Sequence, residues 1–164
     1  MYKMSRMKSL SLFLLVLLSM GTFAANQAQY IDGKVISITD GDTFRIESEN
    51  RRITVKLAGV DAPYKNQEYG MKARQMLGNL LFNKNIRIKV VARTGVSYLE
   101  GVVYLDNKDV NAEMVRHGYA WVIRDAGNIN PLLLKYETEA RNFRRGLWAG
   151  NHPVPPWLWR KLNK

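Results

Sequence analysis

Apolar and polar side chains alternate in five segments of the chain, and a period of two is typical of half-buried β-strands. These segments are residues 33–39, 43–47, 52–57, 86–90 and 99–105. The polar residues between the second and third segments, Glu49-Asn50-Arg51, form a connection short enough for a β-hairpin. With Asn50 and Arg51 at its tip, this hairpin pairs Arg45 with Lys56.

Apolar residues recur at helical spacing in three other segments. These are residues 69–82, 111–117 and 131–145. Gly118 follows the second segment, and the third has Pro131 at its start and Gly146 after its end, as helices commonly do. Helices after the third and the fifth of five strands indicate an α+β fold. Short strands around a small core are compatible with an OB-type β-barrel.

The first 24 residues have the pattern of a signal peptide. Three basic residues precede an apolar run over residues 10–20, and small residues at Thr22 and Ala24 favour cleavage after Ala24. An uncleaved membrane anchor is the alternative, but an apolar run of about a dozen residues is short for a membrane span. We therefore expect an exported protein, periplasmic or secreted, with no stable membrane span after cleavage.

Length and composition indicate one domain after the signal peptide. Residues 25–31 form a polar connector, and residues 32–164 form a domain that ends in a basic tail rich in Pro and Trp. The chain of 164 residues contains no cysteine, which excludes disulfides and thiolate metal sites. The formal net charge is +11, and residues 1–24 account for three basic and no acidic residues, so the remainder carries +8. Such an excess attracts polyanions, whether nucleic acid, anionic lipid or cell-wall polymer, although a solvated basic surface has the same composition.

Three carboxylates are expected to meet at the open end of the hairpin. Asp40 and Asp42 precede its first strand, and Asp61 follows its second. Grouped carboxylates repel one another unless a cation lies among them, and oxygen ligands suit Ca²⁺ or Mg²⁺ better than zinc. An ordinary turn at Asp40-Gly41-Asp42, with Asp61 as a cap before Pro63, is the alternative interpretation.

An ordered set of motifs extends from near residue 32 to the C-terminus. Its members are Asp40-Gly41-Asp42-Thr43, Leu57-Ala58-Gly59-Val60-Asp61-Ala62-Pro63, Asp109-Val110-Asn111, Val115-Arg116-His117-Gly118-Tyr119-Ala120-Trp121, Gly146-Leu147-Trp148 and Pro155-Pro156-Trp157-Leu158-Trp159-Arg160. In order and spacing these motifs resemble the staphylococcal nuclease (thermonuclease) family, and the chain resembles an exported bacterial member with a degenerate active site. The resemblance implies a five-stranded OB-type β-barrel with three helices, Ca²⁺-dependent endonuclease activity, and DNA or RNA as partner.

The resemblance also implies a set of metal ligands. Asp42 and Asp61 match the two Asp side chains of the family's metal site. Ala62 stands where the family uses a backbone carbonyl, and Asp40 matches a nearby acidic residue. The cofactor that these residues imply is Ca²⁺, or Mg²⁺ in its place.

Three other active-site positions of the family carry different residues in this chain. Lys56 and Tyr98 stand at the two Arg positions, and Tyr64 stands at the Glu position. Lysine lacks the bidentate fork of arginine, and a phenol with a pKa near ~10 is a poor base at neutral pH. Glu68 and Arg93 are the nearest candidates to substitute for the missing Glu and Arg. We therefore expect catalysis that is weak or altered.

Three functions remain open on this basis. The first is metal-dependent hydrolysis of DNA or RNA at a reduced rate. The second is a non-catalytic module for nucleic acid or another polyanion, in which tyrosines stack on bases and cationic side chains follow the phosphates. The residues expected to bind nucleic acid are Arg45, Lys56, Arg93, Tyr64 and Tyr98. The third is a protein-interaction domain that uses the Trp-rich tail; in each case we expect a monomer.

Overall fold

A computed structural model describes residues 28–124 and 130–163 of the chain. The predicted signal peptide lies outside these residues, so its prediction is not tested by the structure. Within the described ranges, no helix is both long and apolar enough to cross a membrane.

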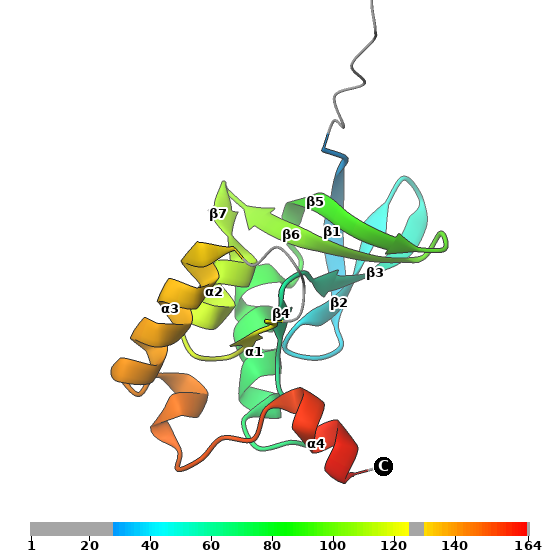
Figure 1. Cartoon of the computed structure of the whole chain (residues 1–164). Helices are drawn as coiled ribbons and strands as arrows, with labels where there is room; N and C mark the ends of the chain where they lie inside the picture. The colour runs from blue at the N-terminus through cyan, green and yellow to red at the C-terminus, as the bar shows by residue number, and fades with distance from the viewer. Residues whose placement is uncertain (1–27, 125–129, 164) are drawn as a thin grey trace, which may run out of the picture.

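Five long strands form a closed barrel. They are β1 (Tyr30–Ile38), β2 (Thr43–Ser48), β3 (Arg51–Leu57), β5 (Asn85–Thr94) and β6 (Tyr98–Leu105). Neighbouring strands run antiparallel in the order β3-β2-β1-β5-β6, and parallel pairing of β3 with β6 closes the sheet (Figure 1). The predicted α+β class and five-stranded OB-type barrel are therefore confirmed.

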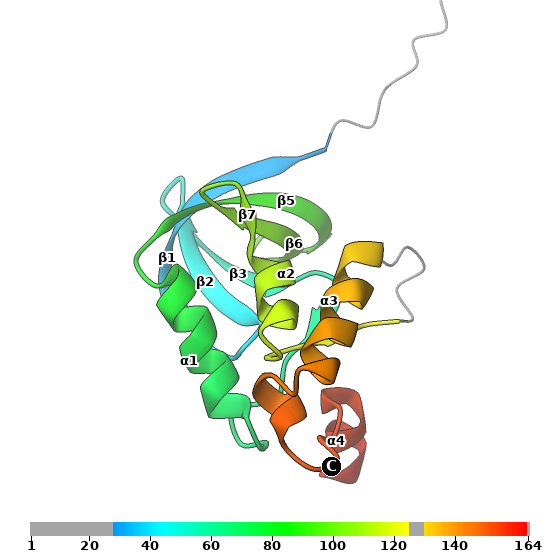
Figure 2. The same ribbon diagram turned by 90° about the vertical axis from the view of Figure 1, so that its left-hand side faces the viewer.

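Helices lie on one side of the barrel (Figure 2). They are α1 (Gly70–Leu81), α2 (Val110–Arg116), α3 (Pro131–Asn142), the 3₁₀ turn η1 (Gly146–Ala149) and α4 (Pro156–Leu162). Three short strands complete the described elements: β4 (Val60–Asp61), β7 (Lys108–Asp109) and β8 (Trp121–Val122). The residues that the structure describes form four α-helices and not the expected three, because the Pro-rich tail continues into α4. Proline is tolerated at the first position of a helix, where its missing N–H has no intrahelical partner.

The alternation that predicts the strands also builds the core. Phe44 and Ile46 of β2 are fully buried, and the residues between and after them face solvent. Val55 of β3 lies opposite Phe44, and Leu77 of α1 joins the same cluster. Burying a side chain of this size stabilises the fold by about 1.5–3 kcal/mol relative to leaving it exposed. The barrel interior therefore holds in place the strands whose ends carry the acidic residues.

The β2–β3 hairpin has a different register from the predicted one. Glu49 and Asn50 form its turn, with φ of 48° and 60°, and Ser48 pairs with Arg51. Two consecutive residues with positive φ are typical of a two-residue type I′ turn, a conformation that Asn adopts readily. The predicted tip at Asn50 and Arg51 is wrong by one residue, so each strand pairing shifts by two.

This register decides which side chain lies beside the acidic turn. Lys56 pairs with Thr43, whereas Arg45 pairs with Thr54 and not with Lys56 as predicted. A shift of two residues keeps every side chain on its predicted face of the sheet, so the core is unaffected. It brings Lys56 opposite the residue that follows Asp42.

Candidate active site

Asp42 is held rigidly at the mouth of the barrel. Its side chain is 6% exposed, Thr43 Oγ1 donates to its Oδ1 at 2.7 Å, and the Ala62 N–H donates to its Oδ2 at 3.0 Å. The preceding Gly41 lets the backbone of this turn pack closely against α1, since a Cβ at position 41 would lie 2.6 Å from the Cβ of Ala73. The carboxylate is therefore buried and fixed by donors from two segments of the chain.

Asp61 reaches the same place from β4. This short strand follows a turn at Gly59, whose φ of 73° favours glycine, and pairs with β8 so that Asp61 lies opposite Trp121. Like Asp42, the Asp61 side chain is 6% exposed.

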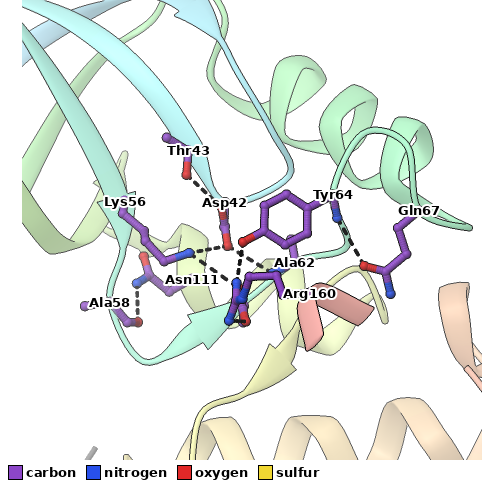
Figure 3. Close-up of polar contacts among 10 residues, drawn as sticks. Asp42, Thr43, Lys56, Ala58, Ala62, Tyr64, Gln67, Asn111 and Arg160 are labelled. Atoms are coloured by element: carbon purple, nitrogen blue, oxygen red, sulfur yellow. Dashed lines mark hydrogen bonds and ion pairs between the residues drawn. The ribbon is translucent and has the colours of Figure 1, made fainter. Parts of the chain in front are cut away.

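A buried asparagine fixes the loop before β4. Asn111 of α2 is 1% exposed, and its Nδ2 donates to the carbonyls of Ala58 at 2.9 Å and Gly101 at 3.1 Å. Its Oδ1 accepts the N–H of Val103 at 3.0 Å. This one side chain thereby connects α2, β6 and the loop that leads to Asp61 (Figure 3).

The Lys56 ammonium lies between the two carboxylates. Its Nζ is 2.6 Å from Asp42 Oδ2 and 3.4 Å from Asp61 Oδ1 (Figure 3). Burial alone disfavours the charged ammonium, but the charges and hydrogen bonds of the two aspartates outweigh it and raise the pKa of Lys56 above its usual value. Lys56 therefore stays protonated at neutral pH and neutralises part of the acidic pair.

Asp61 responds to several neighbours at once. Burial raises the pKa of its carboxyl group, Lys56 lowers it, the charge of Asp42 raises it and Arg160 lowers it, and the resulting pKa lies above its usual value. The two buried carboxylates therefore depend on nearby cations, which in this structure are Lys56 and Arg160.

A second cation reaches Asp61 from the C-terminal helix. Arg160 Nη2 donates to Asp61 Oδ2 at 3.2 Å, and Arg160 Nη1 donates to the Tyr64 hydroxyl. The Tyr64 ring stacks on Trp159, with ring centroids 5.7 Å apart and an interplanar angle of 25°. Part of the Tyr64 ring is thus already in contact with α4, and less of the ring is free to stack on a nucleobase.

The two carboxylates, the Lys56 ammonium, the Tyr64 ring and the Arg160 guanidinium line one cavity of about 270 Å³. Most of the site residues predicted from the sequence meet there: Asp40, Asp42, Lys56, Asp61, Ala62, Tyr64 and Tyr98. Tyr98 begins β6 and pairs with Thr54 across the parallel closure of the barrel. Burial and the negative charge of Glu100 raise the pKa of the Tyr98 hydroxyl, so this group stays a neutral phenol.

Three other predicted residues lie outside that cavity. Glu68 is exposed and lines a different cavity with Trp121 and Trp159. Arg45 is an exposed residue of β2, and Arg93 is an exposed residue of β5. The structure therefore does not bring Glu68 to the carboxylates as a substitute base, nor Arg93 as a substitute guanidinium.

The donor set fits a hard divalent cation. The carboxylates of Asp42 and Asp61 both lie within reach of one cationic nitrogen, Lys56 Nζ, so they are close enough to share a single cation. Among the described residues, no group of three or more acidic or imidazole side chains is spaced for a metal. The prediction of three grouped carboxylates is therefore wrong: Asp40 lines the cavity but does not join Asp42 and Asp61. An ion held by two carboxylates takes its other ligands from backbone carbonyls, water or a substrate phosphate, as Mg²⁺ sites commonly do.

Arg160, Asn111 and Gln67 are the residues of this site that sequence reasoning missed. The sequence indicates Arg160 as a member of the C-terminal motif and as a charge of the tail, but not as a site residue, because the helix that carries it was not predicted. Asn111 is a member of the Asp109-Val110-Asn111 motif, which likewise gave it no part in the site. Gln67 is 7% exposed and donates to the Val154 carbonyl at 2.6 Å, a contact between residues 87 positions apart that no local pattern indicates.

Comparison with known proteins gives a consistent result. A family model described as "Staphylococcal nuclease homologue" matches residues 54–150. An "Uncharacterized endonuclease" of Escherichia coli is 37% identical over 131 residues, which cover 79% of this chain and 85% of that protein. A "Micrococcal nuclease" of Shigella flexneri is 37% identical over 144 residues, which cover 80% of this chain and 82% of that protein.

Proposed function

The chain belongs to the staphylococcal nuclease family, and from this premise we propose that it hydrolyses phosphodiester bonds of DNA or RNA with a divalent cation at Asp42 and Asp61. One observation carries the proposal: two buried carboxylates from separate segments converge on a single cationic nitrogen, that of Lys56. Burying both charges is unfavourable unless cations compensate them, and in this structure Lys56 and Arg160 do so. A divalent ion bound between the two carboxylates would take over that part.

The side chains around the cavity have separate parts in this chemistry. A bound Ca²⁺ or Mg²⁺ would supply a Lewis acid that polarises a phosphoryl oxygen. Asp42 and Asp61 would hold that ion, with the backbone carbonyl of Ala62 as a further ligand. Lys56 lies at the same cavity and offers a point charge to a phosphate oxygen, without the bidentate geometry of arginine.

We propose that the rate is reduced relative to an enzyme with the family's full set of residues. Tyr64 stands at the Glu position and is engaged by Arg160 and Trp159, so it offers no general base. General-base help contributes about 10²–10⁴ in rate, and one electrostatic donor about 10²–10³. The two losses do not simply multiply, because such residues act as a unit.

A non-catalytic nucleic-acid or polyanion binding module is the second candidate. In the part of the chain that the structure describes, the acidic residues lining the cavity are Asp40, Asp42 and Asp61. Asp42 pairs with Lys56, and Asp61 pairs with Arg160. Asp40 lies in the turn after β1, two residues beyond the end of that strand. A site of this kind that binds a phosphate without activating water would give affinity and no cleavage.

The test is cleavage of labelled single- and double-stranded DNA and RNA by the purified protein with Ca²⁺, Mg²⁺ or EDTA. An Asp42→Asn/Asp61→Asn variant should lose the activity, and Asp32→Asn, whose side chain is 63% exposed and paired with Arg87, serves as the matched control. Metal-dependent cleavage that only the double variant loses supports a nuclease. Binding without cleavage supports the second candidate, and the absence of both refutes the two.

We also propose that the protein is exported to the periplasm or the medium, because residues 1–24 have the pattern of a signal peptide. N-terminal sequencing of the protein recovered from cell fractions tests this. A mature chain that begins at Ala25 is the expected result. Recovery of the chain with residues 1–24 intact in the cytoplasm or the membrane contradicts the proposal.

A further inference from the structure

Helix α4 brings one guanidinium to the carboxylate cavity. Arg160 contacts Asp61 at 3.2 Å and donates to the hydroxyl of Tyr64 (Figure 3). It also lines a neighbouring cavity of about 400 Å³, together with Trp157 and Ile123. The Arg160 side chain is 44% exposed, so a ligand in either cavity can reach it.

Two contacts hold α4 in the position that presents Arg160. Trp159 stacks on the ring of Tyr64. Gln67 donates to the Val154 carbonyl at 2.6 Å, two residues before the start of α4, and accepts the N–H of Tyr64 at 3.3 Å. The guanidinium is therefore placed by packing and hydrogen bonds of its own helix and of the preceding segment, and not only by its attraction to Asp61.

The chemistry of these contacts leaves Arg160 available to an anion. The Tyr64 hydroxyl adds no negative charge beside Arg160. Among the described residues, the carboxylate that Arg160 contacts is that of Asp61, which is shared with Lys56. A guanidinium has five N–H donors in a planar fork, which matches two oxygens of a phosphate. Among the described residues that line the carboxylate cavity, Arg160 is the single arginine.

We propose that Arg160 binds the scissile phosphate of a nucleic acid in this cavity. The proposal rests on the proposed function and deepens it, because α4 then supplies the guanidinium that Lys56 and Tyr98 do not. On binding, the non-bridging oxygens of the phosphate replace Asp61 and Tyr64 as acceptors of the Arg160 N–H groups. The matched family model covers residues 54–150 and so includes neither Asp42 nor Arg160.

The test compares Arg160→Gln with Lys161→Gln, which removes the same charge from the next residue of α4. Lys161 is exposed and does not line the cavity. We measure the affinity for a labelled single-stranded oligonucleotide in EDTA, which prevents metal-dependent cleavage, over a range of salt. Arg160→Gln should weaken binding about tenfold or more, as expected for charge-assisted hydrogen bonds. It should also lower the slope of log K against log salt by about 0.7, and Lys161→Gln should do neither.

The salt slope separates a phosphate contact of Arg160 from a role in the packing of α4 alone. Loss of packing would lower the free energy of unfolding, whereas loss of a phosphate contact would lower the salt slope. Circular dichroism and urea unfolding establish that each variant is folded. A folded Arg160→Gln that binds like Lys161→Gln overturns the proposal, while cleavage by the unaltered protein still supports the nuclease function.

Arg160→Lys decides the case in which Arg160→Gln does not fold. Lysine keeps the charge but loses the bidentate fork. Weaker binding with an unchanged salt slope, together with a lower kcat in Ca²⁺, supports the proposal, and affinity and kcat equal to those of the unaltered protein overturn it. If the unaltered protein neither binds nor cleaves, the proposed function fails first and this proposal fails with it.

Discussion

Replacing Asn111 with alanine should destabilise the domain by about 3 kcal/mol. The substitution leaves the Ala58 carbonyl and the Val103 N–H without their partner, whereas the Gly101 carbonyl still accepts the N–H of Ala58 at 2.9 Å. Each buried group left unsatisfied costs about 1–3 kcal/mol. The gain in helix propensity from alanine returns less than about 0.7 kcal/mol. The total is a large part of the ~5–15 kcal/mol that stabilises a typical domain.

Urea unfolding, followed by tryptophan fluorescence, measures this change. The midpoint should fall while the slope m stays the same, which identifies a loss of stability and not a change in the unfolded state. Asn79→Ala, an exposed substitution on α1, is the control and should lie within about 0.5 kcal/mol of the unaltered protein. A loss below about 1 kcal/mol for Asn111→Ala would show that water or a local shift satisfies the two groups, and would refute the reasoning.

Three further outcomes follow from individual contacts. Asp109→Ala removes the side-chain cap that accepts the Ala112 N–H at 2.9 Å and should cost about 1 kcal/mol in urea unfolding, whereas Asp109→Asn should cost much less. Glu137→Ala leaves the buried Val122 N–H unpaired and should cost about 2 kcal/mol, measured by the same assay. Oligonucleotide affinity, measured by fluorescence anisotropy, should fall with salt with a slope of at least about 1.4, because the proposals above assign one phosphate contact to Lys56 and one to Arg160.

The sequence predicts the strands well because they are half-buried, whereas their arrangement as a barrel was implied by the family resemblance. In β2, Phe44 and Ile46 point into the core and Arg45 and Glu47 point out, so the period of two is visible without the structure. The same pattern predicts that Asp42 and Asp61 approach each other, since both flank the paired strands. Periodicity does not fix the register, because a shift of two residues leaves the pattern of faces unchanged.

Contacts of high sequence separation account for what the sequence did not predict. Arg160 and Asp61 are 99 positions apart, and Gln67 and Val154 are 87 positions apart. Neither contact follows from a local period, a cap or a turn. Helix α4 was also hidden by its composition, because two consecutive prolines indicate the end of a regular element as often as the start of one.

Charge connects Tyr64, which stands where the family resemblance places a Glu, with Arg160 beside it. A glutamate at that position would form an ion pair with the guanidinium and neutralise it. The Tyr64 hydroxyl instead accepts a hydrogen bond from Arg160 and leaves its charge in place. In the function proposed here, Tyr64 gives no general base, and Arg160 is left to bind phosphate. On that proposal, we expect the site to hold a phosphodiester better than it activates the water that attacks it.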